Sequence, residues 1–252
     1  EVASALRMVE GSVLLIDGSA GIEVNTNYVW KMARNNELPC FIFINKMDNE
    51  GANFEKVFNE IKESYEGSFI PLTIPYGAGE EYKGIIDLLK KEALIPNDKK
   101  EEKKEIPSDI EDTVEEMRLE LIESIVEQDE ELMEKYFADE KITDKELING
   151  LVDGVASGEI IPVMVGSAIN NSGINSLMDY LVKLVPAPDR ADIIKGKWND
   201  EEVEIKIKED GPVVGLIGKT MVDPYIGKLS IFKMLSGSVS RDTEIYIPRI
   251  DD

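Results

Sequence analysis

The alternation of apolar runs with helical patterns predicts the main architecture of this chain. Short apolar runs occur at 13–16, 41–44 and 160–165, and each ends at polar or glycine residues. Apolar positions at helical spacing follow the first run through Trp30 and the third run from Ile174. Buried strands that alternate with helices are typical of a doubly wound parallel sheet, which binds ligands at the carboxyl ends of its strands. We therefore predict an α/β fold.

Two further segments depart from this alternation. Residues 68–97 carry short strand-like runs, 98–107 form a polar connector rich in Lys and Glu, and 108–157 show two or three helical patterns. Beyond Pro186, alternating apolar positions between 203 and 250 predict antiparallel strands of a barrel or sandwich. We thus predict three parts. A sheet domain comprises 1–67 and 159–188, an acidic inserted subdomain comprises 68–158, and an incomplete β domain comprises 189–252.

The charge of the chain is strongly negative and unevenly distributed. The 252 residues include 28 Lys and Arg against 51 Asp and Glu, which gives a net charge of −23. Residues 101–150 hold 19 acidic and 6 basic residues, a net of −13. A stand-alone binder of nucleic acid or of an anionic membrane would need a basic surface, so we expect neither function.

Missing residue types exclude several kinds of chemistry. The sequence contains no histidine and one cysteine, Cys40. An internal disulfide, a cysteine-rich zinc site and the usual Ser-His triads are therefore excluded within these residues. No apolar run approaches the roughly 20 residues of a membrane-spanning helix, and no signal-peptide pattern begins the sequence. We expect a cytoplasmic protein.

The second apolar run is followed by Asn45-Lys46-Met47-Asp48, which fits a loop that recognises guanine. A carboxylate at Asp48 can accept two parallel hydrogen bonds from the N1–H and exocyclic amine of guanine, whereas adenine presents the wrong edge. The Lys46 stem can lie along the base, and the Asn45 amide can bridge the base and a neighbouring loop. The spacing alone is weak evidence, because a solvated loop can carry the same pattern.

A second element, Gly166-Ser167-Ala168, follows the third apolar run. Small residues at Ser167 and Ala168 let a backbone N–H approach the guanine O6 closely. Two such elements in the correct order on successive strands favour a guanine site over two ordinary turns. We interpret Asp17, at the end of the first run, as a strand-terminal capping residue rather than a Mg²⁺ ligand, because no phosphate loop accompanies it.

Over almost its whole length the chain resembles bacterial elongation factor G and its elongation-factor-G-like paralogues. Five segments carry the resemblance in the same order, namely EVASALRMVEGSVLLIDGSAGIEVNT, INKMDNEGANFEKV, EEYKGIIDLL, IPVMVGSAINNSGINSLMDYLVKLVPAP and MVDPYIGKLSIFKMLSGSV. The resemblance implies half of a doubly wound P-loop-GTPase-type parallel sheet, an inserted α+β subdomain and a partial antiparallel β-barrel. It also implies a parent protein that drives tRNA and mRNA translocation on the ribosome with hydrolysis of Mg·GTP.

Some features of that family do not occur in these 252 residues. There is no Gly-x-x-x-x-Gly-Lys-Ser/Thr phosphate loop and no Asp-x-Pro-Gly-His switch, which carries the family's catalytic histidine. We expect an internal segment of a longer GTPase, with ends that are not natural termini and with Mg²⁺ bound only in the parent. The segment alone should bind GTP or GDP weakly and should not hydrolyse GTP. Its predicted guanine-binding residues are Asn45, Lys46, Asp48, Ser167 and Ala168.

The helix predicted over 110–127 carries a stripe of carboxylates. Its acidic side chains fall within an arc of about 80°, whereas Val114, Met117, Leu121 and Ile125 lie on the opposite side. By resemblance, the inserted subdomain of elongation factor G is where the C-terminal domain of the ribosomal stalk protein docks. We therefore predict a docking face for a basic protein partner, the acidic stripe, formed by Asp112, Glu116, Glu120, Glu123 and Glu127.

The first apolar run also predicts a surface for self-association. In the family fold the three strands are contiguous, and the strand at 13–16 has no neighbour on its other side within this sequence. A bare apolar edge is a template for strand pairing, so we predict either self-association or a rearranged element that covers the edge.

Two other functions are compatible with the sequence. An acidic protein-interaction module would carry a vestigial nucleotide site, and titration with guanine nucleotides would separate it from a GTPase. A ribosome-protection GTPase of the tetracycline-resistance type shares the guanine loops, but the EEYKGIIDLL segment fits elongation factor G better. The sequence leaves open whether the parent is the main translocase or a paralogue.

Overall fold

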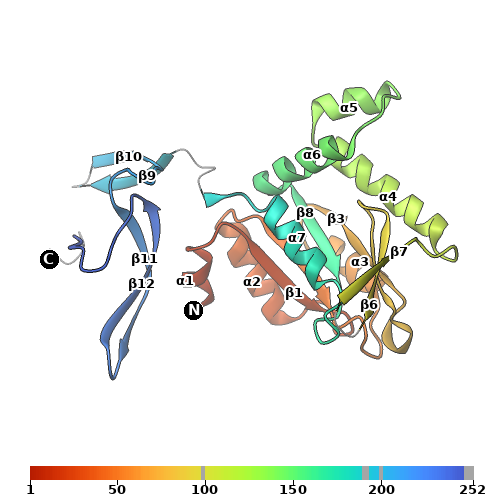
Figure 1. Ribbon diagram of the computed structural model, residues 1–252, viewed down its shortest axis with the longest axis horizontal. Helices are drawn as coiled ribbons and strands as arrows, with labels where there is room; N and C mark the ends of the chain where they lie inside the picture. Colours follow the sequence, from red (N-terminus) through yellow and green to blue (C-terminus); the bar gives the residue numbers. More distant parts are fainter. Residues whose placement is uncertain (98–99, 189–192, 199–200, 247–252) are drawn as a thin grey trace. The chain divides into compact units, whose positions relative to one another are not determined.

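The computed structural model describes residues 1–97, 100–188, 193–198 and 201–246. The chain divides into two compact units, a larger one of Glu10–Pro186 and a smaller one of Glu1–Val9 together with Ala187–Asp252. The elements of each unit are labelled in Figure 1. Among the described residues, no helix is both long enough and apolar enough to cross a membrane.

A four-stranded parallel sheet forms the centre of the larger unit (Figure 1). Its strands are, in spatial order, β1 (Ser12–Asp17), β2 (Cys40–Asn45), β8 (Ile160–Val165) and β3 (Ser68–Pro71). Both central strands are buried almost throughout, as expected for a sheet that is covered on both faces. The three strands predicted from the apolar runs are therefore confirmed, and they are adjacent.

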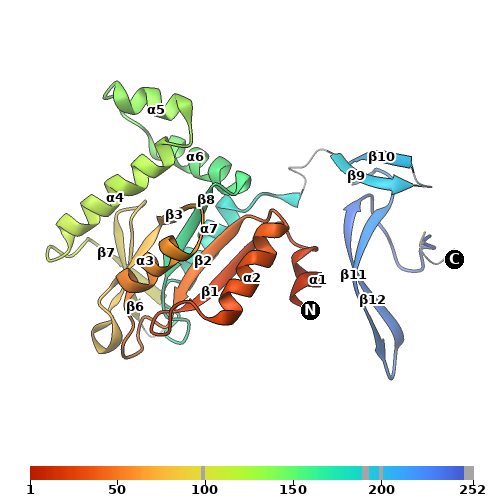
Figure 2. The same ribbon diagram turned by 180° about the vertical axis from the view of Figure 1, so that it is seen from behind.

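Helices cover the two faces of this sheet. α2 (Val24–Asn35) and α3 (Phe54–Ser64) lie on one face, and α7 (Ile174–Leu184) lies on the other (Figure 1 and Figure 2). On the first face, the buried Trp30 of α2 stacks on Tyr65 with ring centroids 4.7 Å apart. This is the predicted α/β fold, and it brings the carboxyl ends of β2 and β8 to one edge.

The segment between α3 and β8 contributes to two different sheets. The sequence pattern assigns 68–71 to the inserted subdomain, whereas in the structure these residues form β3 and pair with β8 in the main sheet. Burial of Phe69 and Ile70 explains the pairing, because the sheet covers their side chains. The second sheet is antiparallel, with the order β4 (Thr73–Tyr76), β5 (Gly84–Asp87), β6 (Glu92–Asn97) and β7 (Lys100–Lys104).

The prediction of an irregular connector over 98–107 is wrong for residues 100–104, because these form the strand β7. This strand pairs only with β6 in the described sheet, so it is ordered by backbone hydrogen bonds and needs no apolar alternation. A cross-strand ion pair between Lys103 Nζ and Glu92 Oε1, 2.9 Å apart, adds to the pairing. An edge strand of this kind leaves no hydrophobic pattern in the sequence.

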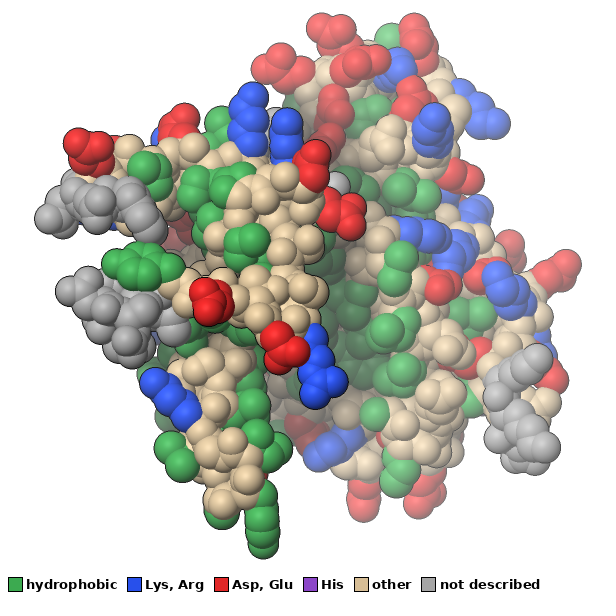
Figure 3. Space-filling model, turned by 60° about the vertical axis from the view of Figure 1, so that its left-hand side comes forward, with side chains coloured by type: hydrophobic (Ala, Val, Ile, Leu, Met, Phe, Trp, Pro, Cys, Tyr) green, Lys and Arg blue, Asp and Glu red, His purple; other side chains and the backbone are tan. Residues whose placement is uncertain are grey.

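Three helices complete the larger unit, and one of them carries the acidic stripe. They are α4 (Glu111–Val126), α5 (Glu130–Phe137) and α6 (Asp144–Ser157). In α4, Val114, Leu121 and Ile125 are fully buried, while all five carboxylates of the acidic stripe are exposed. Acidic side chains also gather over α5, at the top of the view in Figure 3.

The smaller unit consists of short antiparallel elements. Two hairpins, β9 (Ile193–Trp198) with β10 (Glu201–Lys206) and β11 (Val214–Asp223) with β12 (Gly227–Ser236), form separate two-stranded sheets. The predicted strands near 203–207, 213–217 and 229–235 are confirmed. Residues 244–246 are irregular, and the end of that predicted run lies outside the described residues.

The N-terminal helix α1 (Val2–Leu6) belongs to this smaller unit, although the sequence pattern places it with the sheet domain. The Lys219 ammonium of β11 lies 2.7 Å from the Glu1 carboxylate, and Met8 lies against Gly218. Contacts between residues more than 200 positions apart cannot be read from local spacing.

Candidate functional site

The first predicted loop begins where β2 ends and is anchored by Met47. The Met47 side chain is fully buried, its N–H donates to the Gly166 carbonyl oxygen at 3.1 Å, and its carbonyl accepts from the Gly79 N–H at 2.8 Å. Lys46 takes a left-handed backbone conformation with φ of 63°. The loop turns sharply at Lys46, and buried contacts hold it immediately before Asp48.

Asp48 carries an acceptor that nothing in the described part of the chain satisfies. Its Oδ1 atom is enclosed and has no hydrogen-bond partner among those residues. An enclosed carboxylate oxygen without a donor is costly, so such a group in a folded protein requires an explanation. A ligand that brings N–H donors to this position would supply one.

The second predicted loop is a tight turn between β8 and α7. Ser167 and Ser172 exchange two backbone hydrogen bonds of 3.0 and 2.9 Å, which closes the turn. A β-carbon at Gly166 would overlap the Ser172 carbonyl oxygen, so the close approach requires glycine there. Ala168 and Ile169 lie at the exposed tip of the turn. We call residues 166–173 the second loop.

A direct hydrogen bond joins the two loops. The Ala168 N–H donates to Asn45 Oδ1 at 2.9 Å, across 123 residues of sequence. The two sequence elements therefore lie side by side at the carboxyl edge of β2 and β8, as the parallel topology requires. Asn45 makes the link to the neighbouring loop that its amide group was predicted to make.

Lys46 and Ser167 take up positions that their motifs did not specify. The Lys46 ammonium donates a hydrogen bond to Asp17 Oδ2 at 2.7 Å, at the end of β1, and this bond, followed by that of the Ser19 hydroxyl, holds the pKa of the Asp17 carboxyl well below its usual range. Ser167 is fully buried, and its hydroxyl accepts from the Asn170 N–H at 3.4 Å. Its side chain thus lies inside the turn.

Asp17 itself caps the end of its strand, which is the interpretation favoured from the sequence. Its Oδ1 atom accepts from the Ser19 and Ala20 N–H groups at 2.9 and 3.2 Å. Among the described residues, no group of three or more His, Cys, Asp or Glu side chains could hold a metal ion.

Two residues beside the site have no signal in the motifs. The Tyr82 hydroxyl lies 2.8 Å from Ser172 Oγ, and Glu101 Oε1 accepts from the Gly173 N–H at 2.6 Å. Glu101 belongs to β7, the strand that periodicity misses, and Tyr82 follows a short turn whose glutamates are solvent-exposed. Only the fold brings them to the second loop.

This geometry defines a class of protein. A parallel α/β sheet whose two central strands end in linked loops at one edge is typical of nucleotide-binding α/β domains.

Comparison with known proteins identifies the family. Residues 1–187 match the family described as the elongation factor Tu GTP binding domain. The chain belongs to this family, and its domain is thus a GTP-binding domain of the translational GTPases. A crystal structure of a protein from Thermus thermophilus is similar, with a TM-score of 0.81 and 25% sequence identity over 94% of this chain. The match covers 33% of that protein, so this chain spans about a third of its length.

Proposed function

We propose that this chain is the guanine-reading segment of an elongation-factor-G-type translational GTPase, a cytoplasmic protein that drives translocation on the ribosome. The observation that carries the proposal is the hydrogen bond from the Ala168 N–H to Asn45 Oδ1, next to an Asp48 carboxylate oxygen that no described residue contacts as a donor. Together with the inserted acidic subdomain, this arrangement favours elongation factor G over other translational GTPases.

In the proposed complex, each predicted residue has a distinct task. Asp48 accepts hydrogen bonds from the guanine N1–H and exocyclic amine, and the Ala168 N–H turns to the guanine O6 from Asn45 Oδ1, its acceptor in the structure. The Lys46 stem lies along the base while Asp17 holds its ammonium group. Ser167, buried inside the turn, contributes by shaping the backbone rather than by touching the base.

Nucleotide titration tests this proposal. GDP added to the ¹⁵N-labelled chain should shift the amide signals of 45–48 and 166–169, with a Kd no tighter than about the high micromolar range because no phosphate loop contributes. ADP should leave these signals unchanged. GTP turnover should equal the buffer blank, since no residue here positions Mg²⁺ or the γ-phosphate. Absence of any GDP-dependent shift would instead favour an acidic interaction module.

The acidic stripe supports a second part of the proposal, docking of a basic protein such as the C-terminal domain of the ribosomal stalk protein. Its five carboxylates are exposed on α4, and Glu123 accepts a hydrogen bond from the Tyr136 hydroxyl at 2.7 Å. Like charges along one helix face repel, so the stripe costs helix stability. Docking of a partner with the opposite charge would explain why the helix keeps a face that lowers its stability.

Charge reversal on α4 should slow association with the stalk C-terminal domain. We expect Glu116→Lys/Glu120→Lys to lower the on-rate about tenfold at low salt, because the charges mainly steer the encounter, and to have little effect at high salt. Glu201→Lys/Glu202→Lys on β10 makes the same charge change on exposed residues and serves as the control. Equal on-rates for both variants would contradict docking at the stripe.

The edge of β1 supports a proposal of self-association. β1 pairs with β2 on one side only in the described sheet, and the outward side chain of Leu15 is 62% exposed. Sedimentation velocity over a hundredfold concentration range should show dimers or larger species, and Leu15→Lys should shift the distribution toward the monomer. A concentration-independent monomer for the unsubstituted chain would exclude the proposal.

A further inference from the structure

The second loop is held from outside by two residues of the insert, Tyr82 and Glu101. We propose that these two are positioning residues for the guanine base, which they influence by fixing the backbone of the loop that meets O6. The inference rests on the proposed function, since it assigns a role within that same site. Neither residue belongs to the guanine motifs.

Tyr82 holds the turn at its closing pair. Its hydroxyl lies 2.8 Å from the Oγ of Ser172, which is fully buried and whose backbone closes the turn with Ser167. Burial is the main cause that raises the pKa of Tyr82 well above its usual range, so the hydroxyl stays protonated throughout the physiological range. A neutral, enclosed hydroxyl of this kind fixes the loop and does not take part in proton transfer.

Glu101 holds the same loop at its last residue. Its two carboxylate oxygens accept from the Gly173 N–H at 2.6 Å and from Asn175 Nδ2 at 3.2 Å. Gly173 has a φ of 78° and is the N-cap of α7, where the exposed N–H groups of a helix favour a negative charge. Glu101 therefore fixes both the end of the second loop and the start of the helix behind it.

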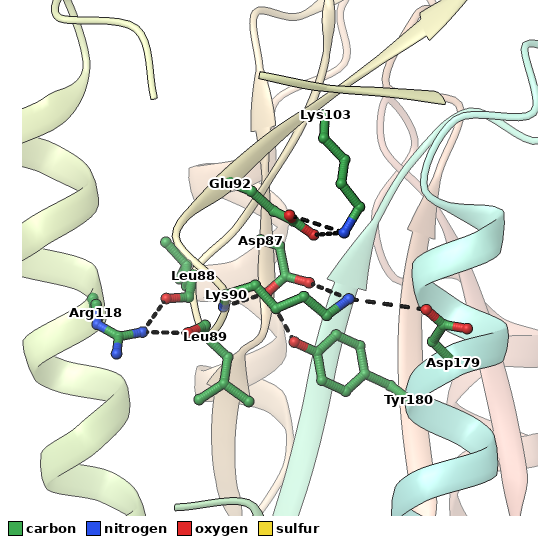
Figure 4. A network of polar contacts seen from close by, with 9 residues as sticks. All are labelled: Asp87, Leu88, Leu89, Lys90, Glu92, Lys103, Arg118, Asp179 and Tyr180. Carbon is green, nitrogen blue, oxygen red and sulfur yellow. Dashed lines mark hydrogen bonds and ion pairs between the residues drawn. The ribbon is translucent and has the colours of Figure 1, made fainter. Parts of the chain in front are cut away.

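The insert also holds the helix that follows the loop (Figure 4). The Tyr180 hydroxyl of α7 donates to Asp87 Oδ1 at 2.8 Å, and Lys90 Nζ lies 3.1 Å from Asp87 Oδ2. Arg118 of α4 donates to the carbonyl oxygens of Leu88 and Leu89, each at 2.6 Å. The Tyr180 hydroxyl thus ties α7 to the insert, on the same helix whose N-cap follows the second loop.

This arrangement has a specific consequence for the nucleotide. The Ala168 N–H lies four residues before Ser172 and five before Gly173, within the single turn that these contacts close. Loss of either contact should misplace the donor to O6 and leave the Asp48 carboxylate in position. The expected defect is thus confined to one edge of the base.

Inosine diphosphate separates the two edges, because it keeps O6 and N1–H and lacks the exocyclic amine that Asp48 reads. We expect Tyr82→Phe and Glu101→Ala in the 252-residue chain to weaken GDP and IDP equally, about three- to tenfold for each lost hydrogen bond, by NMR titration. The ratio of GDP to IDP affinity should stay that of the unsubstituted chain. Tyr76→Phe in β4 and Glu102→Ala, next to Glu101 in β7, make the same chemical changes and should have no effect.

Thermal unfolding midpoints distinguish a loss of positioning from a general loss of stability in these variants. The positioning role requires weaker binding at an unchanged midpoint, together with a shifted Ala168 amide signal in the nucleotide-free variants. Variants that bind GDP like the unsubstituted chain, or a GDP to IDP ratio that changes, would overturn the inference while the proposed function stands. An unsubstituted chain that binds neither nucleotide would remove the proposed function and the inference with it.

Discussion

Asp48→Ala should lower the affinity of this chain for GDP by about a hundredfold or more, which moves Kd into the millimolar range or beyond. The carboxylate makes two charge-assisted hydrogen bonds to guanine in the proposed complex, each worth about 1.5–3 kcal/mol. Its Oδ1 atom has no hydrogen-bond partner in the described structure, so its removal breaks no hydrogen bond at that atom. NMR titration with GDP measures the loss, and thermal unfolding checks that the fold is retained.

The matched substitutions make this prediction specific for the base. Asp48→Asn keeps the shape of the side chain and replaces one carboxylate acceptor by an amide donor. This donor can bond to the O2 of xanthine, whereas it meets another donor, the amine, in guanine. We therefore expect this variant to prefer xanthosine diphosphate over GDP. Glu50→Ala removes an exposed carboxylate two residues away and should leave the affinity unchanged. Equal GDP binding by all three variants would show that Asp48 does not read the base.

Asp87→Ala should destabilise the larger unit by about 3–5 kcal/mol, the range observed when one partner of a buried charge network is removed. The Asp87 side chain has no exposed surface, and it accepts from the Tyr180 hydroxyl at 2.8 Å and from the Lys90 N–H at 2.9 Å. Burial, together with the adjacent carboxylate, raises the pKa of Tyr180 far above its usual range, so the tyrosine remains a donor that would lose its acceptor. Urea unfolding monitored by circular dichroism measures the change.

Asp179→Ala provides the control for this substitution. Asp179 lies 3.9 Å from the same Lys90 ammonium, but its side chain is 64% exposed. Exposed ion pairs contribute about 0–1 kcal/mol, so this variant should unfold almost like the unsubstituted chain. If both variants lost a similar free energy of unfolding, burial would not be the reason for the contribution of Asp87 to stability.

The strands and the two loops of the candidate site could be predicted from the sequence because their signals are local. A strand covered on both faces is a continuous apolar run, as at 41–44 and 160–165, and polar residues mark where it ends. Parallel topology then places the ends of successive strands at one edge. The proximity of Asn45 and Ala168 follows from these two facts, and the hydrogen bond between them agrees.

Contacts between elements that carry no periodic signal could be found only from the tertiary structure. β7 is polar because it is an edge strand, so the position of Glu101 at the start of α7 could not be read from the pattern. The same holds for Asp17, whose capping role was predicted but whose ion pair with Lys46 was not. A side chain's own sequence neighbourhood determines whether it is buried in a strand or helix, but its hydrogen-bond partner depends on which distant element the fold places against it.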